Sequence, residues 1–197
     1  MNMDWIGTAV GFVLGVLSTL FTERINLWLN RPGIQVSFQP DEQCLRESNA
    51  QVNDGTRIFL TESKFLRVKV SNRRRHPAKG CRCLVTAIRR ASSEKSGIIL
   101  GDTLPLRWAY LGFQPIDIPA GATFYADILS TLQNNRHFTI ELEAQPLVLN
   151  QATTDAAMYT VEVAVVGDNF DPVALRIYFD WKQDWDFSDV WAEQIQS

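Results

Sequence analysis

The densest set of side chains that could do chemistry is a basic segment in the middle of the chain. Residues 64–95 hold eleven of the 19 Lys and Arg residues and a single acid, Glu94, although the whole chain has a formal net charge of −3. At its centre Arg73-Arg74-Arg75 lies within residues 72–80, where we expect a hairpin-like loop between two strands. A guanidinium group can bond two phosphate oxygens at once, so this segment indicates a site for a phosphate-rich ligand.

The candidate ligand residues lie in that loop and on the strands that lead into it. We expect strand pairing to bring several of them together, with Arg67 and Lys69 on an exposed face, around the phosphates of a nucleotide or oligonucleotide. The candidates are Arg67, Lys69, Arg73, Arg74, Arg75, Lys79 and Arg82.

Two other interpretations of the basic segment stay open. It could be a solvated charged face, partly neutralised by acids near the C-terminus such as Asp180, Asp184 and Glu193. It could also be attracted to anionic lipid headgroups, which requires the loop to face a membrane. The sequence contains no nucleic-acid-binding motif that would decide among the three.

The other reactive side chains form no catalytic or metal-binding pattern. His76, Cys81 and Cys83 have the spacing H-x4-C-x-C, which matches no zinc site, and the two cysteines fall on one face of a strand, where small buried thiols are common. A Gly-x-Ser-x-Gly elbow, a P-loop and a dinucleotide loop are all missing. We therefore expect no enzymatic activity, no metal and no cofactor.

The first element is an apolar segment, residues 5–22, that carries no charge over 18 residues. This length is near the lower limit for crossing a bilayer, and Trp5 and Trp28 stand where interfacial aromatics sit. Residues 1–4 contain no Lys or Arg, and no Ala-x-Ala cleavage site follows the apolar segment. Both observations argue against a cleaved signal peptide. The sequence predicts a transmembrane helix with an interfacial extension over residues 1–31 and a linker at 32–33.

The small and polar residues of this helix gather within an arc of about 120°, which predicts a packing face. Small residues let helix backbones approach in a bilayer, and hydroxyl groups bond across helices, so we expect a homo-oligomer. Whether the face seals against its neighbours or lines a pore stays open. Its residues are Asp4, Gly7, Thr8, Gly11, Gly15, Ser18, Thr19 and Thr22.

The charges that flank the helix predict its orientation. Arg24 and Arg31 follow the apolar segment, whereas the residues before it include Asp4 and no Lys or Arg. The positive-inside rule therefore places the N-terminus outside and the body in the cytoplasm. An odd number of cysteines agrees with a reducing compartment. With lipid as one partner, the expected location is a bacterial inner membrane.

Residues 34–181 alternate apolar and polar side chains between turn clusters, without any βα repeat. This pattern predicts a mainly β body, an antiparallel Ig-like sandwich, with a barrel as the alternative. Residues 182–197 form an acidic aromatic tail whose aromatics we expect to pin the terminus to the core, with a short helix at 189–195. The strands are expected at residues 34–38, 65–70, 81–88, 139–142, 159–166 and 173–181.

The architecture, carried by WIGTAVGFVLGVLSTLFT and RRRHPAKGCRC, resembles the single-pass membrane effectors of bacterial anti-phage defence. One such candidate is the Hailong-type effector, which is paired with a nucleotidyltransferase. The resemblance implies an oligomeric inner-membrane protein that forms a channel under the control of a nucleotide or oligonucleotide signal. Neither string is a family-specific motif. The alternative is a non-conducting membrane-anchored scaffold whose β-sandwich recruits a protein partner.

Overall fold

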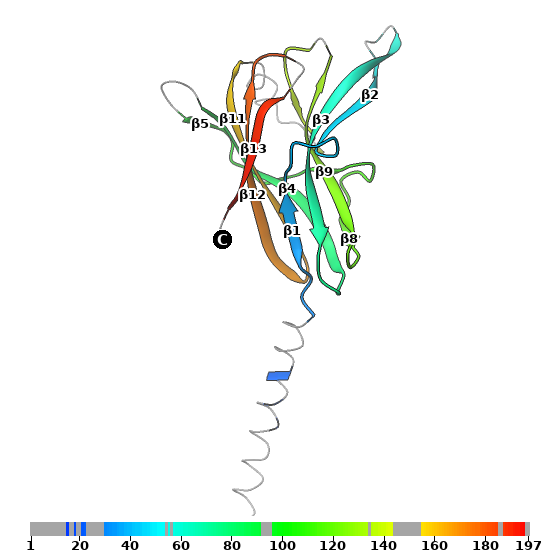
Figure 1. Ribbon diagram of the computed structural model, residues 1–197, viewed down its shortest axis with the longest axis vertical. Coiled ribbons are helices and arrows are strands. Elements are labelled where there is room, and N and C mark those ends of the chain that lie inside the picture. Colours follow the sequence, from blue (N-terminus) through cyan, green and yellow to red (C-terminus); the bar gives the residue numbers. More distant parts are fainter. Residues whose placement is uncertain are drawn as a thin grey trace, which may run out of the picture.

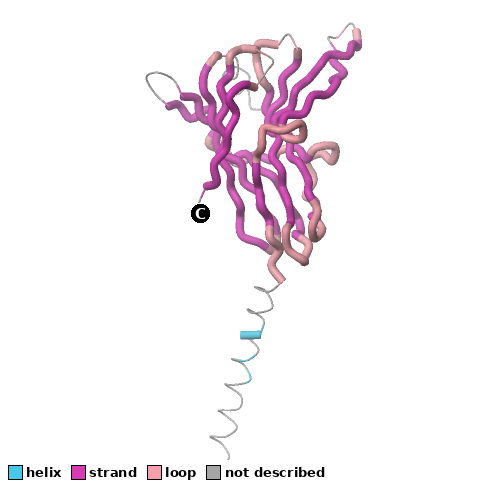
Figure 2. Tube along the Cα trace, viewed as in Figure 1, coloured by secondary structure: helices cyan, strands magenta, loops and turns pink. Residues whose placement is uncertain are grey.

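The computed structural model describes residues 15, 18, 21, 22, 30–53, 55, 57–91, 96–133, 135–143, 155–184 and 187–195. From residue 34 onwards these residues form two antiparallel sheets that pack face to face (Figure 1, Figure 2). Alternation with a period of two places the apolar side chains of each strand on the face that meets the other sheet. The predicted mainly β, two-sheet architecture is therefore confirmed, and the narrower Ig-like assignment stays a prediction.

One sheet has six strands and is organised around its longest member. Its strands are β1 (Ile34–Ser37), β2 (Leu45–Asn53), β3 (Ile58–Asn72), β7 (Arg107–Trp108), β9 (Thr123–Leu132) and β10 (Thr139–Ile140). β1 and β2 pair with successive halves of one edge of β3, and β9 pairs with the other edge. β7 and β10 in turn pair with β9.

The other sheet has seven strands. They are β4 (Ala78–Ala91), β5 (Ser96–Leu100), β6 (Leu104–Pro105), β8 (Ile116–Ile118), β11 (Ala157–Gly167), β12 (Phe170–Trp181) and β13 (Ser188–Ile195). The long strands follow the order β13-β12-β11-β4-β5, and β6 and β8 pair with β4. Four of the six predicted strand segments lie wholly within strands of the two sheets, whereas the segments 34–38 and 139–142 extend one and two residues past β1 and β10.

An aromatic cluster closes the core near the C-terminus. Phe138 meets the rings of Tyr159, Phe179 and Trp181 edge to face, with centroids 5.0, 5.2 and 5.3 Å apart. Such pairs add about 0.5–1.5 kcal/mol each beyond the area they bury. Trp181 and Phe187 are both buried, so these two side chains fasten this end of the chain to the core, whereas Trp191 of the tail is 44 % exposed.

The sequence also predicts a short helix over residues 189–195, and this prediction is wrong. The segment belongs to strand β13, which pairs with β12 and extends the sheet beyond the predicted boundary at residue 181. Trp191 stacks on Tyr178 with ring centroids 5.1 Å apart, and Glu193 forms an ion pair with Arg176 at 2.9 Å. These cross-strand pairs stabilise a strand where the local spacing also suits a helix.

Of the predicted transmembrane segment, the structure describes Gly15, Ser18, Phe21 and Thr22, which have helical backbone and are exposed. Within the described residues there is no helix with the length and hydropathy needed to span a membrane. Asp4, Gly7, Thr8, Gly11 and Thr19 lie outside the described residues. The transmembrane helix therefore stays a prediction.

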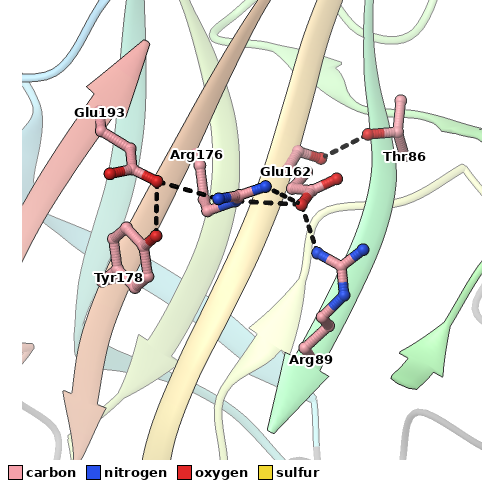
Figure 3. Close-up of polar contacts among 6 residues, drawn as sticks. All are labelled: Thr86, Arg89, Glu162, Arg176, Tyr178 and Glu193. Atoms are coloured by element: carbon pink, nitrogen blue, oxygen red, sulfur yellow. Dashed lines mark hydrogen bonds and ion pairs between the residues drawn. The ribbon is translucent and has the colours of Figure 1, made fainter. Parts of the chain in front are cut away.

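A polar network crosses four strands on the outer face of the seven-stranded sheet (Figure 3). Glu162 of β11 accepts hydrogen bonds from Arg89 of β4 and from Arg176 of β12, the latter at 2.9 and 3.0 Å. Arg176 and Tyr178 continue it to Glu193 of β13, at 2.9 and 2.6 Å. Two cations and two carboxylates thus satisfy one another, which indicates a structural role in fixing the register of β4, β11, β12 and β13.

The network makes stability depend on pH. Burial alone would raise the pKa of Glu162, but the hydrogen bonds and charges of Arg89 and Arg176 outweigh it and hold this pKa below its ordinary value of 4.5. Because the folded pKa is lower than the unfolded one, the ionised Glu162 contributes stability above about pH 4.5 that is lost as the pH falls through the folded value.

We expect Glu162→Gln to lower the free energy of unfolding at pH 7 by about 1–2 kcal/mol, a magnitude reduced by the partial exposure of both arginines. The loss should shrink as the pH falls below about 4.5, because the wild-type ion pairs weaken there. Urea denaturation of the full chain in detergent at several pH values measures both effects. Glu42→Gln, at an exposed carboxylate, is the control. An equal loss at every pH would contradict the assignment.

Candidate functional site

The loop 73–77, which holds the three successive arginines, connects β3 to β4. The sequence predicts a hairpin here, and this is wrong: β3 and β4 belong to different sheets, so the loop crosses from one to the other at the end of the sandwich where residues 30–33 enter (Figure 1). The reason lies in the strands, since Val68 and Val70 face the core from one sheet while Cys81 and Cys83 face it from the other. We call this loop, with Arg31, Lys79 and Arg82, the basic end.

The buried side chain of Asn72 holds the basic end together. Its Oδ1 accepts the backbone N–H groups of Gly33 at 3.1 Å and Arg74 at 3.3 Å. Its Nδ2 donates to the carbonyls of His76 at 2.7 Å and Ile118 at 3.1 Å. These four bonds use both acceptor positions and both donors of the carboxamide. Asn72 therefore joins the loop, the linker and β8 at one point.

Two further contacts fasten residues 31–33 to this end of the sandwich. The backbone N–H of Arg73 donates to the carbonyl of Gly33 at 2.9 Å, and Arg31 forms an ion pair with Asp171 at 2.6 Å. The aliphatic part of Arg74 covers Gly33 so closely that a Cβ there would come within 2.6 Å of it. A recess of about 270 Å³ lies between Arg31, Arg74 and Asp171. The linker is thus a structural part of the basic end.

The basic end presents cations without partners. Arg73, Arg74, Arg75, Lys79 and Arg82 are all exposed, and across the described part of the chain none of them forms an ion pair. Of the acids beside them, Asp117 accepts the N–H of Gly80 at 2.9 Å and Asp171 holds Arg31. Asp168 lies next to Gly80 and lines a recess with Arg82. Exposed guanidinium groups with free N–H donors can bind phosphate oxygens in bidentate fashion.

Arg67 lies elsewhere, contrary to prediction. It is 6 % exposed on the outer face of the six-stranded sheet and forms an ion pair of 2.5 Å with the buried Asp127, which also holds Arg107 at 3.0 Å. Asp127 stands directly opposite Arg67 in the register of β3 and β9. A buried carboxylate needs such a partner, so Arg67 is committed to it. Lys69 is half-buried between Ser37 and Tyr125, its neighbours on β1 and β9.

Sequence reasoning missed Asn72 and Asp127. Asp127 left a signal, because an acid inside the apolar run FYADIL indicates a buried charge that needs a partner. Asn72 left none, since its four partners come from three separate segments of the chain, namely the linker, the loop and β8.

The cysteines have a structural role. Cys81 and Cys83, which the sequence places on one face of a strand, are both buried in the core. Burial raises the pKa of Cys81 to about 11 and raises that of Cys83 further, so both thiols stay protonated and unreactive. Among the described residues, no three His, Cys, Asp or Glu side chains gather closely enough to hold a metal ion.

No family profile, curated protein or solved structure matches this chain.

Asn72→Ala should lower the free energy of unfolding by about 2–4 kcal/mol, because it leaves several buried backbone groups unpaired at about 1–3 kcal/mol each. Ser71→Ala is the matched control, because the neighbouring hydroxyl is exposed and, among the described residues, its side-chain partner is Thr123 at 3.0 Å. Denaturant unfolding of both variants measures the difference. Equal stability of the two variants would show that the carboxamide does not hold the basic end together.

Proposed function

We propose that this chain is an oligomeric membrane effector whose β-sandwich binds the phosphates of a nucleotide or oligonucleotide at the basic end. In this proposal residues 5–22 cross a bacterial inner membrane and the sandwich, Ig-like in its finer class, lies in the cytoplasm. The observation that carries the proposal is the shared anchor Asn72, which bonds both the arginine loop and the linker that follows the apolar segment. A ligand on the loop would therefore act on the linker through two hydrogen bonds.

The coupling follows from ordinary linkage. Phosphates bound by Arg73 and Arg75 favour the loop conformation that contacts them best. Because the N–H of Arg73 bonds the carbonyl of Gly33, a change of the loop alters the position of the linker. The ligand can shift the membrane segments only if it binds one arrangement more tightly than another.

Self-association of the apolar segment completes the proposal. Gly15 has open space where a Cβ would stand, so a second helix can approach closely there. The hydroxyls of Ser18 and Thr22 bond to the backbone of their own segment, at 2.8 and 2.7 Å, and expose no unsatisfied hydrogen. Gly7 and Gly11 would extend this face. The resemblance to anti-phage effectors adds a nucleotidyltransferase as the source of the ligand.

Anionic lipid headgroups offer the same phosphate chemistry. The basic end is fastened to the linker only a few residues beyond the predicted membrane segment, so this second candidate is supported by the contact of Arg31 with Asp171. Competition between free oligonucleotide and vesicles with or without anionic lipid separates the two candidates.

Arg73→Glu/Arg75→Glu should weaken binding of a single-stranded oligonucleotide at least tenfold and flatten its salt dependence, which falls by about 0.7 in slope for each lost phosphate contact. Arg74 is left in place because it packs on Gly33. Arg57→Glu/Arg136→Glu changes the net charge equally at loops of the other end of the sandwich. Fluorescence anisotropy with full-length protein in neutral-lipid nanodiscs measures affinity. If both variants lose affinity equally, or if neither loses affinity, the basic end is not the phosphate-binding site.

Conduction is tested in liposomes. We expect ion flux that changes when oligonucleotide is added, and we expect Gly11→Leu/Gly15→Leu to reduce both self-association and flux because larger side chains hold the helices apart. Val13→Leu, on the opposite face of the helix, is the control. If no ligand state conducts, the scaffold that recruits a protein partner is the better description.

A further inference from the structure

A strained tyrosine stands at the mouth of a recess on the outer face of the six-stranded sheet. Tyr110, in the loop after β7, has a φ of +68° and is 83 % exposed. Bulky side chains rarely adopt this backbone region, and such strain concentrates at binding sites. The loop is fixed by reciprocal hydrogen bonds between Trp108 and Gly112, at 2.8 and 3.2 Å, above the buried Trp108 side chain. The backbone of Tyr110 is therefore held in one conformation at the mouth of the recess.

Flat groups line the recess. The guanidinium carbon of Arg67 lies 5.2 Å from the ring centre of Tyr110 and 5.3 Å from that of Phe65, and that of Arg107 lies 5.7 Å from Phe65. The recess has a volume of about 340 Å³ and reaches down to Asp127. This is the lower end of the size range of small-ligand pockets.

The charges around the recess are already ordered. Asp127, 2 % exposed, fixes Arg67 and Arg107 from below, and Glu141 holds Arg107 at 3.1 Å. On the rim, Arg46 stands opposite Phe65 in the pairing of β2 with β3 and is exposed. The recess therefore has guanidinium groups held by carboxylates inside it and an exposed cation, Arg46, at its edge.

We propose that this recess is a nucleobase-binding subsite, in which a base stacks on the rings of Tyr110 and Phe65, while the buried guanidinium group of Arg67 forms the floor beneath them. The inference rests on the proposed function, because the base belongs to the oligonucleotide whose phosphates the basic end holds. Aromatic rings and guanidinium planes are the surfaces on which proteins stack unpaired bases. Arg46 is placed to bind the phosphate that follows this base.

The spacing of the two sites defines the ligand. Arg67 and Arg73 are six residues apart on one strand and its end, or about 20 Å at a rise of about 3.3 Å per residue. A single strand of about six stacked nucleotides, at about 3.4 Å each, covers that distance. The structure therefore favours an oligonucleotide over a mononucleotide.

Base stacking is separated from phosphate binding by two probes of equal length. One is single-stranded oligodeoxyadenylate of about ten nucleotides, within the usual site sizes, and the other is an abasic strand with the same phosphates. We expect the wild-type chain in neutral-lipid nanodiscs to bind the first about 5- to 150-fold more tightly, the preference expected for one stacked base. Tyr110→Gly should remove the preference, and Tyr110→Phe should keep it.

Glycine suits a φ of +68°, so Tyr110→Gly removes the ring without added strain, and an unchanged melting temperature shows that it is folded. Leu111→Ala, at the adjacent exposed side chain, should bind as the wild type does. Equal affinity of the wild-type chain for both strands would overturn the subsite and leave the basic end intact. Binding of neither strand would overturn the proposed function and the subsite with it.

Discussion

The basic end of the sandwich depends on one buried carboxamide. Asn72 is 1 % exposed, and its two donors and two acceptor positions are all occupied by backbone groups. No other orientation of the amide satisfies two N–H donors on one side and two carbonyls on the other. A buried donor or acceptor without a hydrogen-bond partner costs free energy, so the loop, the linker and β8 must be in place together. This requirement gives the arginine loop its fixed relation to the segment that precedes the sandwich.

Charge pairing then decides which basic residues are available to a ligand. Arg67, Arg89 and Arg90 lie on strands, and each forms an ion pair with a carboxylate on the neighbouring strand or, for Arg90, with Asp155 just before it. The loop has no neighbouring strand, so Arg73 and Arg75 stay exposed and free of acids among the described residues. Basic composition alone treats these residues as one patch, whereas the sheets separate them into structural and solvent-facing sets.

Alternation of side chains predicted segments of six strands and a two-sheet body, because a period of two is a local property of the chain. It did not predict β2 or β9, although β9 pairs with β3 along the middle of the six-stranded sheet. The crossing of residues 73–77 between sheets was not predictable in that way, because it depends on which partners β3 and β4 choose far along the sequence. The same holds for β13, whose strand conformation is stabilised by Tyr178 and Arg176 on β12. Tyr110 could not be found from sequence, since its importance lies in its backbone conformation.

The central claim is that ligand binding at the arginine loop reaches the linker through Asn72. Hydrogen exchange at the amide of Gly33 tests it directly, because that N–H bonds the Asn72 side chain at 3.1 Å. In liposome-embedded protein, oligonucleotide should change the exchange rates of Gly33 and Arg73 together, and Asn72→Ala should leave the Gly33 amide unresponsive. A ligand that alters exchange in the loop of the wild-type chain but leaves Gly33 unchanged would contradict the coupling.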